Sequence, residues 1–169
     1  MTGTFAQRLD RIARNLLPLA ISISLVVLSV LPVYLPGYGE VAANLVLMSV
    51  FYWSVHRPEL IAPANAFAIG LLQDVLGGTP PGMNALLLVL VRSVVVTQGR
   101  VFRGKSFLVL WWGFSLVAMG AGLALWVLSM GYAMTSIDPM PGMFRWALTV
   151  ALFPLFAGLF ARVQNSVLQ

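Results

Sequence analysis

Residues 62–84 read APANAFAIGLLQDVLGGTPPGMN, an apolar run that meets one acid, breaks at a turn-forming segment and then becomes apolar again. We interpret this pattern as a short membrane helix, a tight turn and the beginning of the next helix. Ala62, Ala66 and Gly70 are spaced four residues apart, and Asp74 continues the same row. A row of small side chains on one helix face lets a second backbone approach closely within lipid. We therefore expect Asp74 to point into protein and not into hydrocarbon.

The composition indicates an integral membrane protein. Of the 169 residues, 60% are hydrophobic and 9% are charged, whereas a soluble domain carries roughly 25% charged residues. The chain has no cysteine and one histidine, which excludes a disulfide framework, a thiolate metal site and a histidine-cluster metal site. We recognise no Ser-His-Asp set, no glutamate-histidine helix motif and no carboxylate pair facing a pocket. The sequence therefore predicts neither enzyme activity nor a cofactor.

Hydropathy and turn residues predict an all-α fold with six membrane-spanning helices in a single domain. The expected spans are residues 15–35, 39–55, 58–76, 83–98, 106–133 and 143–163, preceded by a basic amphipathic segment over 1–14. The second, third and fourth spans are short, because about 16 residues cover only ~24 Å of a hydrocarbon core ~30 Å thick. We expect the longer spans to shelter them.

The distribution of charge predicts the orientation of the chain. The turns on one side of the predicted spans hold Glu40 and Asp138, with Arg145 just inside the sixth span. The other side holds eight basic residues: Arg8, Arg11, Arg14, Arg57, Arg100, Arg103, Lys105 and Arg162. Cytoplasmic loops carry an excess of Lys and Arg, so we expect both termini in the cytoplasm. The net charge of +5 is then explained by topology and not by nucleic-acid binding.

Two charges, Asp74 and Arg92, lie well within the predicted spans. A lone charge at the membrane centre costs between about 3 and more than 10 kcal/mol, so such groups pair or face a cavity. Arg92 is roughly 15 Å from the turn and Asp74 only a few Å, so a direct ion pair requires Arg92 to extend upward. Backbone carbonyls, Asn65 or a lipid headgroup are the other partners for Arg92. The pattern favours a polar clamp that fixes helix packing or a partner over a proton- or substrate-coupled site.

The segment from Gly77 to Gly82, GGTPPG, predicts a tight reversal between two helices. It lacks the lysine and the strand-to-helix context of a phosphate-binding loop, and its prolines suit the start of the next helix. The expected partner-binding or structural clamp residues are Gly70, Asp74, Gly77, Gly78, Pro80, Gly82, Asn84 and Arg92. Small residues in the last two spans suit either internal packing or docking of another membrane helix: Ala118, Gly122, Ala157 and Ala161.

An aromatic group ends the second predicted span, and we expect Phe51, Tyr52 and Trp53 to form a belt at a headgroup layer. Residues 51–59, FYWSVHRPE, hold an aromatic pair before a basic-Pro turn. Residues 66–86, AFAIGLLQDVLGGTPPGMNAL, hold Gly-Leu-Leu-x-Asp, a small-residue turn, Pro-x-Gly and an apolar run. In these two segments the chain resembles a known family, the rod shape-determining proteins MreD. Pro81 departs from the bulkier apolar residue that many members have.

The resemblance implies a six-span bundle similar to the membrane substrate-binding subunits of energy-coupling-factor transporters. It implies a non-enzymatic scaffold of the bacterial inner membrane that supports peptidoglycan synthesis and rod shape. The implied partners are a single-span MreC-like protein, the RodA and transpeptidase complex, MreB indirectly, and membrane lipids.

Two alternatives stay open. The first is a solute-binding subunit of a vitamin-type uptake transporter, which needs a polar pocket under the outer turns, lined by residues such as Asn44, Asn65, Gln73, Asp74, Asn84 and Arg92. The second is a lipid-handling enzyme, which the lack of a catalytic set opposes.

Overall fold

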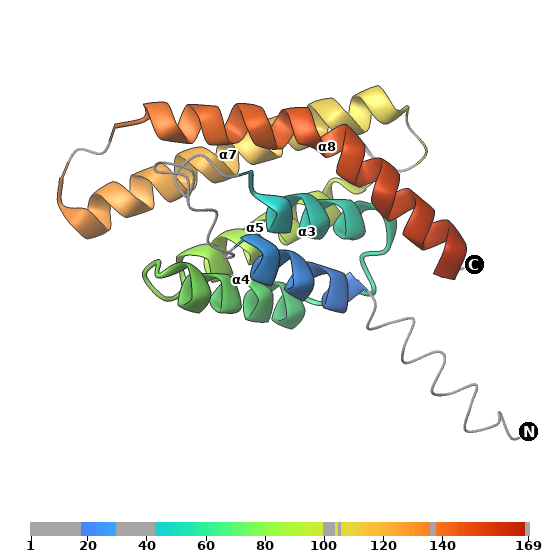
Figure 1. The fold of residues 1–169 in the computed structure, drawn as a ribbon, viewed down its shortest axis with the longest axis horizontal. Helices are drawn as coiled ribbons and strands as arrows, with labels where there is room; N and C mark the ends of the chain where they lie inside the picture. Colours follow the sequence, from blue (N-terminus) through green and yellow to red (C-terminus); the bar gives the residue numbers. More distant parts are fainter. Residues whose placement is uncertain (1–17, 30–42, 100–103, 105, 136–137, 168–169) are drawn as a thin grey trace, which may run out of the picture.

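The computed structural model describes residues 18–29, 43–99, 104, 106–135 and 138–167, and all regular structure in these ranges is helical (Figure 1). The six helices are Pro18–Ser29, α3 (Leu45–His56), α4 (Pro63–Gly77), α5 (Met83–Thr97), α7 (Phe107–Ala133) and α8 (Met140–Val167). The predicted all-α class holds for this part of the chain. Among these helices, α7 and α8 are long and apolar enough to cross a membrane. Six membrane spans therefore stay a prediction.

Helix α3 forms the centre of the packing. It lies between the long α7–α8 pair and the α4–α5 pair (Figure 1), and it contacts α5, α7 and α8. All ten residues from Val46 to Val55 are buried. The Pro18–Ser29 helix joins α3 through a hydrogen bond of 2.9 Å between the Ser22 and Ser49 hydroxyls. A helix that is apolar on every side is buried in a protein core or in a membrane, and α3 is buried among the other helices.

Aromatic rings connect α3 to the long helices. The Phe51 ring lies 5.1 Å from that of Phe114 on α7 and 5.8 Å from that of Phe153 on α8, and these two rings stack at 4.0 Å. The expected aromatic belt at a headgroup layer is wrong, because Phe51, Tyr52 and Trp53 are all within the buried core. With helix pairs on both sides, this end of α3 has no lipid-facing surface.

Two helices begin later than the predicted spans. The residue before α3, Asn44, accepts the Leu47 N–H at 3.1 Å through Oδ1, so α3 begins with an N-cap. Helix α4 begins at Pro63, after Ala62 with an extended backbone (ψ 156°). The residue before a proline prefers this conformation, and proline suits the first helical turn. Residues 39–42 of the second predicted span lie outside the described residues.

Helix α8 begins earlier than predicted and is longer, with 28 residues. Asp138 Oδ1 accepts the Met140 N–H at 2.9 Å, which satisfies one free donor at the helix start. Pro154 lies inside α8, where it removes one backbone hydrogen bond, and the helix changes direction part-way along its length (Figure 1).

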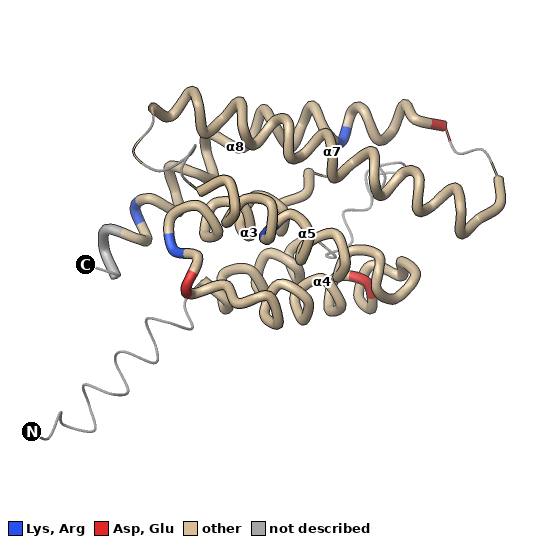
Figure 2. Tube along the Cα trace, turned by 180° about the vertical axis from the view of Figure 1, so that it is seen from behind, with Lys and Arg blue, Asp and Glu red and all other residues tan. Residues whose placement is uncertain are grey.

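Charged residues are sparse over the described chain, and few of them lie along the sides of the helices (Figure 2). Large apolar side chains on these sides are exposed, among them Leu116 and Leu123 on α7 and Leu155 and Leu159 on α8. This surface is suited to contact with hydrocarbon.

Candidate functional site

The Asp74 carboxylate lies where α4 folds back onto α5, and it is completely buried (0% exposed). Its Oδ1 accepts hydrogen bonds from the Thr79 hydroxyl (2.7 Å), the Asn84 N–H (3.1 Å) and the Asn84 side-chain amide (2.8 Å). Its Oδ2 accepts from the N–H groups of Gly82 (2.9 Å) and Ala85 (3.3 Å). Five donors therefore surround the two oxygens.

These donors explain how a carboxylate is tolerated inside an apolar bundle. The N–H groups of Gly82, Asn84 and Ala85 belong to the N-cap and first turn of α5, where helices leave their donors unsatisfied. The positive end of the helix dipole also favours an anion there. Asp74 on α4 thus caps α5 across the turn. With five donors in place, the roughly four lone-pair sites of the carboxylate are occupied.

The backbone of the turn depends on two glycines. Gly78 has φ +68° and its N–H donates to the Asp74 carbonyl. The Thr79 N–H donates to the same carbonyl at 3.1 Å, a pattern that closes the end of a helix. Gly82 has φ +100° and serves as the N-cap of α5. Both positive φ values lie in the left-handed region that other residues adopt only at a cost.

Gly70 is the point of closest approach between α4 and α5. A Cβ atom at this position would lie 2.4 Å from the Ala85 Cα and 2.6 Å from the Ala85 nitrogen. No side chain fits there without moving the α5 backbone. By contrast, a Cβ atom on Gly77 would meet nothing within 4 Å. Pro80 contributes only its carbonyl, which accepts the Met83 N–H at 3.3 Å.

Arg92 does not join Asp74. Its Nε donates to the Ile61 carbonyl at 2.8 Å, and its Nη2 approaches the Pro58 carbonyl at 3.5 Å. Both carbonyls precede α4, so Arg92 ties α5 to the chain at the end of the α4–α5 pair that is opposite to the turn. The sequence left three kinds of partner open for Arg92, and in the structure its hydrogen-bond acceptors are backbone carbonyls. The hydrogen bonds of Asp74 thus join the helix pair at the turn, and those of Arg92 join it at the opposite end.

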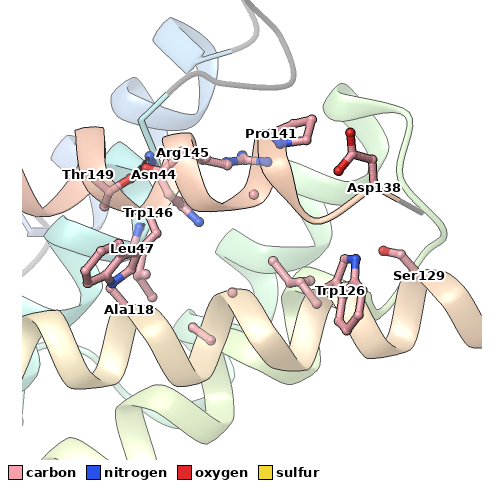
Figure 3. Close-up of a pocket in the computed structure, with 14 residues that line it drawn as sticks. Asn44, Leu47, Ala118, Trp126, Ser129, Asp138, Pro141, Arg145, Trp146 and Thr149 are labelled. Carbon is pink, nitrogen blue, oxygen red and sulfur yellow. Dashed lines mark hydrogen bonds between the residues drawn. The ribbon is translucent and has the colours of Figure 1, made fainter. Parts of the chain in front are cut away.

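A cavity of about 560 Å³ lies apart from these contacts, between the beginnings of α3 and α8 and the second half of α7 (Figure 3). Its polar lining residues are Asn44, Ser129, Asp138, Arg145 and Thr149. Of the six residues that we expected to line a pocket, this cavity contains Asn44 alone. Sequence reasoning missed Arg145 as a lining residue. The available signal was its position as the one basic residue on the otherwise acidic side of the predicted spans.

A smaller cavity of about 420 Å³ lies beside the α4–α5 turn. Thr79, Pro80 and Pro81 line it together with Ser129 and Tyr132 of α7. Ser129 lines both cavities, so the two adjoin at the same end of the bundle. Asp74 lines neither of them.

A family model described as rod shape-determining protein MreD matches residues 10–163, which is nearly the whole chain. No curated protein and no solved structure gives a significant match. The expected likeness to the binding subunits of energy-coupling-factor transporters therefore stays a prediction.

Proposed function

Because the chain belongs to the family of rod shape-determining proteins MreD, we propose that it is a non-enzymatic membrane scaffold that binds a single-span partner of the MreC type. Family membership places the chain in a membrane and in rod-shape determination. The proposal adds the partner, the bacterial inner membrane and the support of peptidoglycan synthesis through RodA, a transpeptidase and, indirectly, MreB.

The observation that carries the proposal is that the two charges within α4 and α5 are used to hold these helices together. The Asp74 carboxylate has five donors, and the Arg92 guanidinium donates to carbonyls that precede α4. Groups that catalyse or carry protons must reach a substrate, and these two reach only their own chain. A helix pair closed at both ends is a rigid element, which suits a scaffold.

The same helix pair has a surface that suits binding of a single-span partner. Helices α4 and α5 have 15 residues each, or about 22 Å, less than the ~30 Å hydrocarbon core. Both expose a row of large apolar side chains, which together we call the hairpin face: Phe67, Leu71 and Val75 on α4 and Leu86, Leu90 and Val94 on α5. A hydrophobic helix too short for its bilayer is relieved by associating with other helices. We propose that the partner's span covers the hairpin face.

Two of the four small residues expected to pack or dock, Ala118 and Ala157, are 4% and 5% exposed, so they serve packing within the chain. Gly122 is exposed and Ala161 is partly buried. We propose an orientation in which the α4–α5 turn faces outward and both termini are cytoplasmic. The basic residues Arg57 and Arg162, near the ends of α3 and α8, then lie on the cytoplasmic side, as the positive-inside rule requires.

Cysteine cross-linking tests where the partner binds. The chain has no cysteine, so single cysteines report on single positions. We compare Leu90→Cys on the hairpin face with Leu116→Cys on α7, which are 52% and 62% exposed. Each is expressed with an MreC-type partner that carries one cysteine in its span. We expect an oxidative cross-link with Leu90→Cys and little with Leu116→Cys; the reverse result contradicts the proposed face.

Depletion tests the wider function. Cells depleted of this protein are expected to become round, and mild-detergent purification is expected to recover cell-wall synthesis proteins with it. Normal rods after depletion, or recovery of an energising module of a vitamin transporter, would contradict the scaffold. Five of the six polar residues that a transporter pocket was expected to use do not line either cavity.

A further inference from the structure

The cavity between α3, α7 and α8 contains a cation that nothing in the described chain neutralises. Arg145 lines this cavity (Figure 3), and its guanidinium has no hydrogen-bond acceptor and no ion-pair partner among the residues that the structure describes. Its backbone carbonyl accepts from the Thr149 hydroxyl at 2.6 Å, which leaves the side chain unaffected. Asp138 lines the same cavity, but its Oδ1 accepts the Met140 N–H. Among the described residues, the Arg145 side chain is therefore without a partner for its charge.

A second free donor lies beside the same space. Asn44 uses its Oδ1 for the Leu47 N–H and its own N–H for the Thr149 hydroxyl at 3.0 Å. Its Nδ2 group has no acceptor among the described residues. The Trp146 indole already donates to the Ser115 carbonyl at 3.2 Å. Arg145 and Asn44 thus offer free donors to the cavity, and a guanidinium binds phosphate and carboxylate oxygens most strongly.

Apolar residues make up most of the remaining lining, and the cavity borders the lipid-facing helices. Leu47, Ala118, Ala121 and Leu125 line it, and at Gly122 an added Cβ atom would meet nothing within 4 Å. Its volume of about 560 Å³ lies within the range of small-molecule sites, about 300–1,000 Å³. Helices α7 and α8, which form two of its walls, are the membrane-crossing candidates among the described helices. A ligand that fits has both an anionic head and an apolar body.

We propose that this cavity binds the phosphate-bearing head of a membrane lipid, with the phosphate at Arg145 and Asn44 and the hydrocarbon leaving along α7 and α8. Arg145 is five residues past the start of α8 at Met140, or about 8 Å along the axis, and so lies near one end of a membrane-crossing candidate. Asp138 in the lining opposes a second negative charge on the ligand. A phosphodiester lipid with one charge is therefore preferred over a phosphomonoester. This site does not depend on the proposed partner.

Native mass spectrometry of the delipidated full chain tests the site. The probes are phosphatidylglycerol, a diacylglycerol with the same acyl chains, and inorganic phosphate. Gly122→Phe is designed to fill the cavity, because Gly122 lines it and an added Cβ atom there meets nothing within 4 Å. Gly120→Phe is the matched control, since it is on the same helix, has equally open surroundings and does not line the cavity. Arg145→Gln removes the charge.

We expect the unsubstituted chain and Gly120→Phe to bind phosphatidylglycerol alike and Gly122→Phe to lose binding. Arg145→Gln is expected to weaken binding on the order of tenfold or more, as loss of a charged hydrogen bond does. Diacylglycerol should not compete. Equal binding by Gly122→Phe and Gly120→Phe overturns the proposal, and so does competition by diacylglycerol or by inorganic phosphate at the same concentration. If Arg145→Gln does not fold, the two glycine variants decide.

Discussion

Replacing Asp74 with alanine tests the fold-back of α4 onto α5. The substitution removes the acceptor of five hydrogen bonds. Alanine is a good helix former, so α4 itself should be retained. Thr79 and Gly82 lie in a partly exposed turn and can recover their bonds with water. Asn84 and Ala85, which are 7% and 0% exposed, cannot do so easily. Their buried N–H groups are therefore left without partners.

The size of the effect depends on these two groups. An unsatisfied buried donor costs about 1–3 kcal/mol, so the loss for Asn84 and Ala85 together is about 2–6 kcal/mol, with about 3 kcal/mol expected after local relaxation. For a chain of 169 residues, each kcal/mol lowers Tm by about 2–4 °C. Asp74→Ala should therefore lower Tm by about 6–12 °C.

The assay is thermal unfolding in a mild detergent, combined with amide hydrogen exchange over residues 82–85. Asp138→Ala is the matched control, because among the described residues this exposed acid accepts one hydrogen bond, from the Met140 N–H. Its loss should cost about 1 kcal/mol, as loss of a helix-end cap does. The reasoning is refuted if Asp74→Ala unfolds within about 2 °C of the unsubstituted chain, or no lower than Asp138→Ala. It is equally refuted if amide exchange over residues 82–85 does not change.

Three further substitutions have defined outcomes. Gly70→Ala should lower Tm by more than Gly77→Ala, because its Cβ atom would lie 2.4 Å from α5 backbone whereas that of Gly77 meets nothing within 4 Å; equal melting would contradict the close approach. Arg92→Leu should leave the Ile61 carbonyl unpaired and cost about 1–3 kcal/mol, measured by denaturant titration; no loss would show that the 2.8 Å bond contributes little. Phe114→Ala should cost about 3–5 kcal/mol, because this ring is 0% exposed; a loss below about 1 kcal/mol would contradict the aromatic core.

The local features of the helix pair could be predicted from sequence because they depend on near neighbours in the chain. The turn over residues 77–82 is predicted by its Gly and Pro content. The row of small residues that ends at Asp74 indicated that this carboxylate points into protein, in agreement with its burial. Its role as a cap for α5 could not be predicted, because spacing does not say which donors a turn brings to a carboxylate.

Features that depend on long-range packing escaped prediction. Phe51 and its neighbours have the composition of an interfacial belt, and only the presence of α7 and α8 on one side and α5 on another makes them core. The choice between partners for Arg92 depended on where the chain before α4 passes. The environment of Arg145 is set by three helices that are separate in sequence, and the bond between Asn44 and Thr149 joins residues 105 positions apart.

The most direct test of the scaffold account is Asp74→Asn in cells that depend on this protein for rod shape. Cell aspect ratio, the amount of folded protein and the amount of co-purified single-span partner are measured in the same cultures. If the carboxylate is structural, we expect aspect ratio, folded protein and recovered partner to fall together. Cells that keep folded, partner-bound protein should then stay rod-shaped. Round cells with undiminished folded protein and undiminished partner recovery would show that the carboxylate performs chemistry or transport, and would contradict the account.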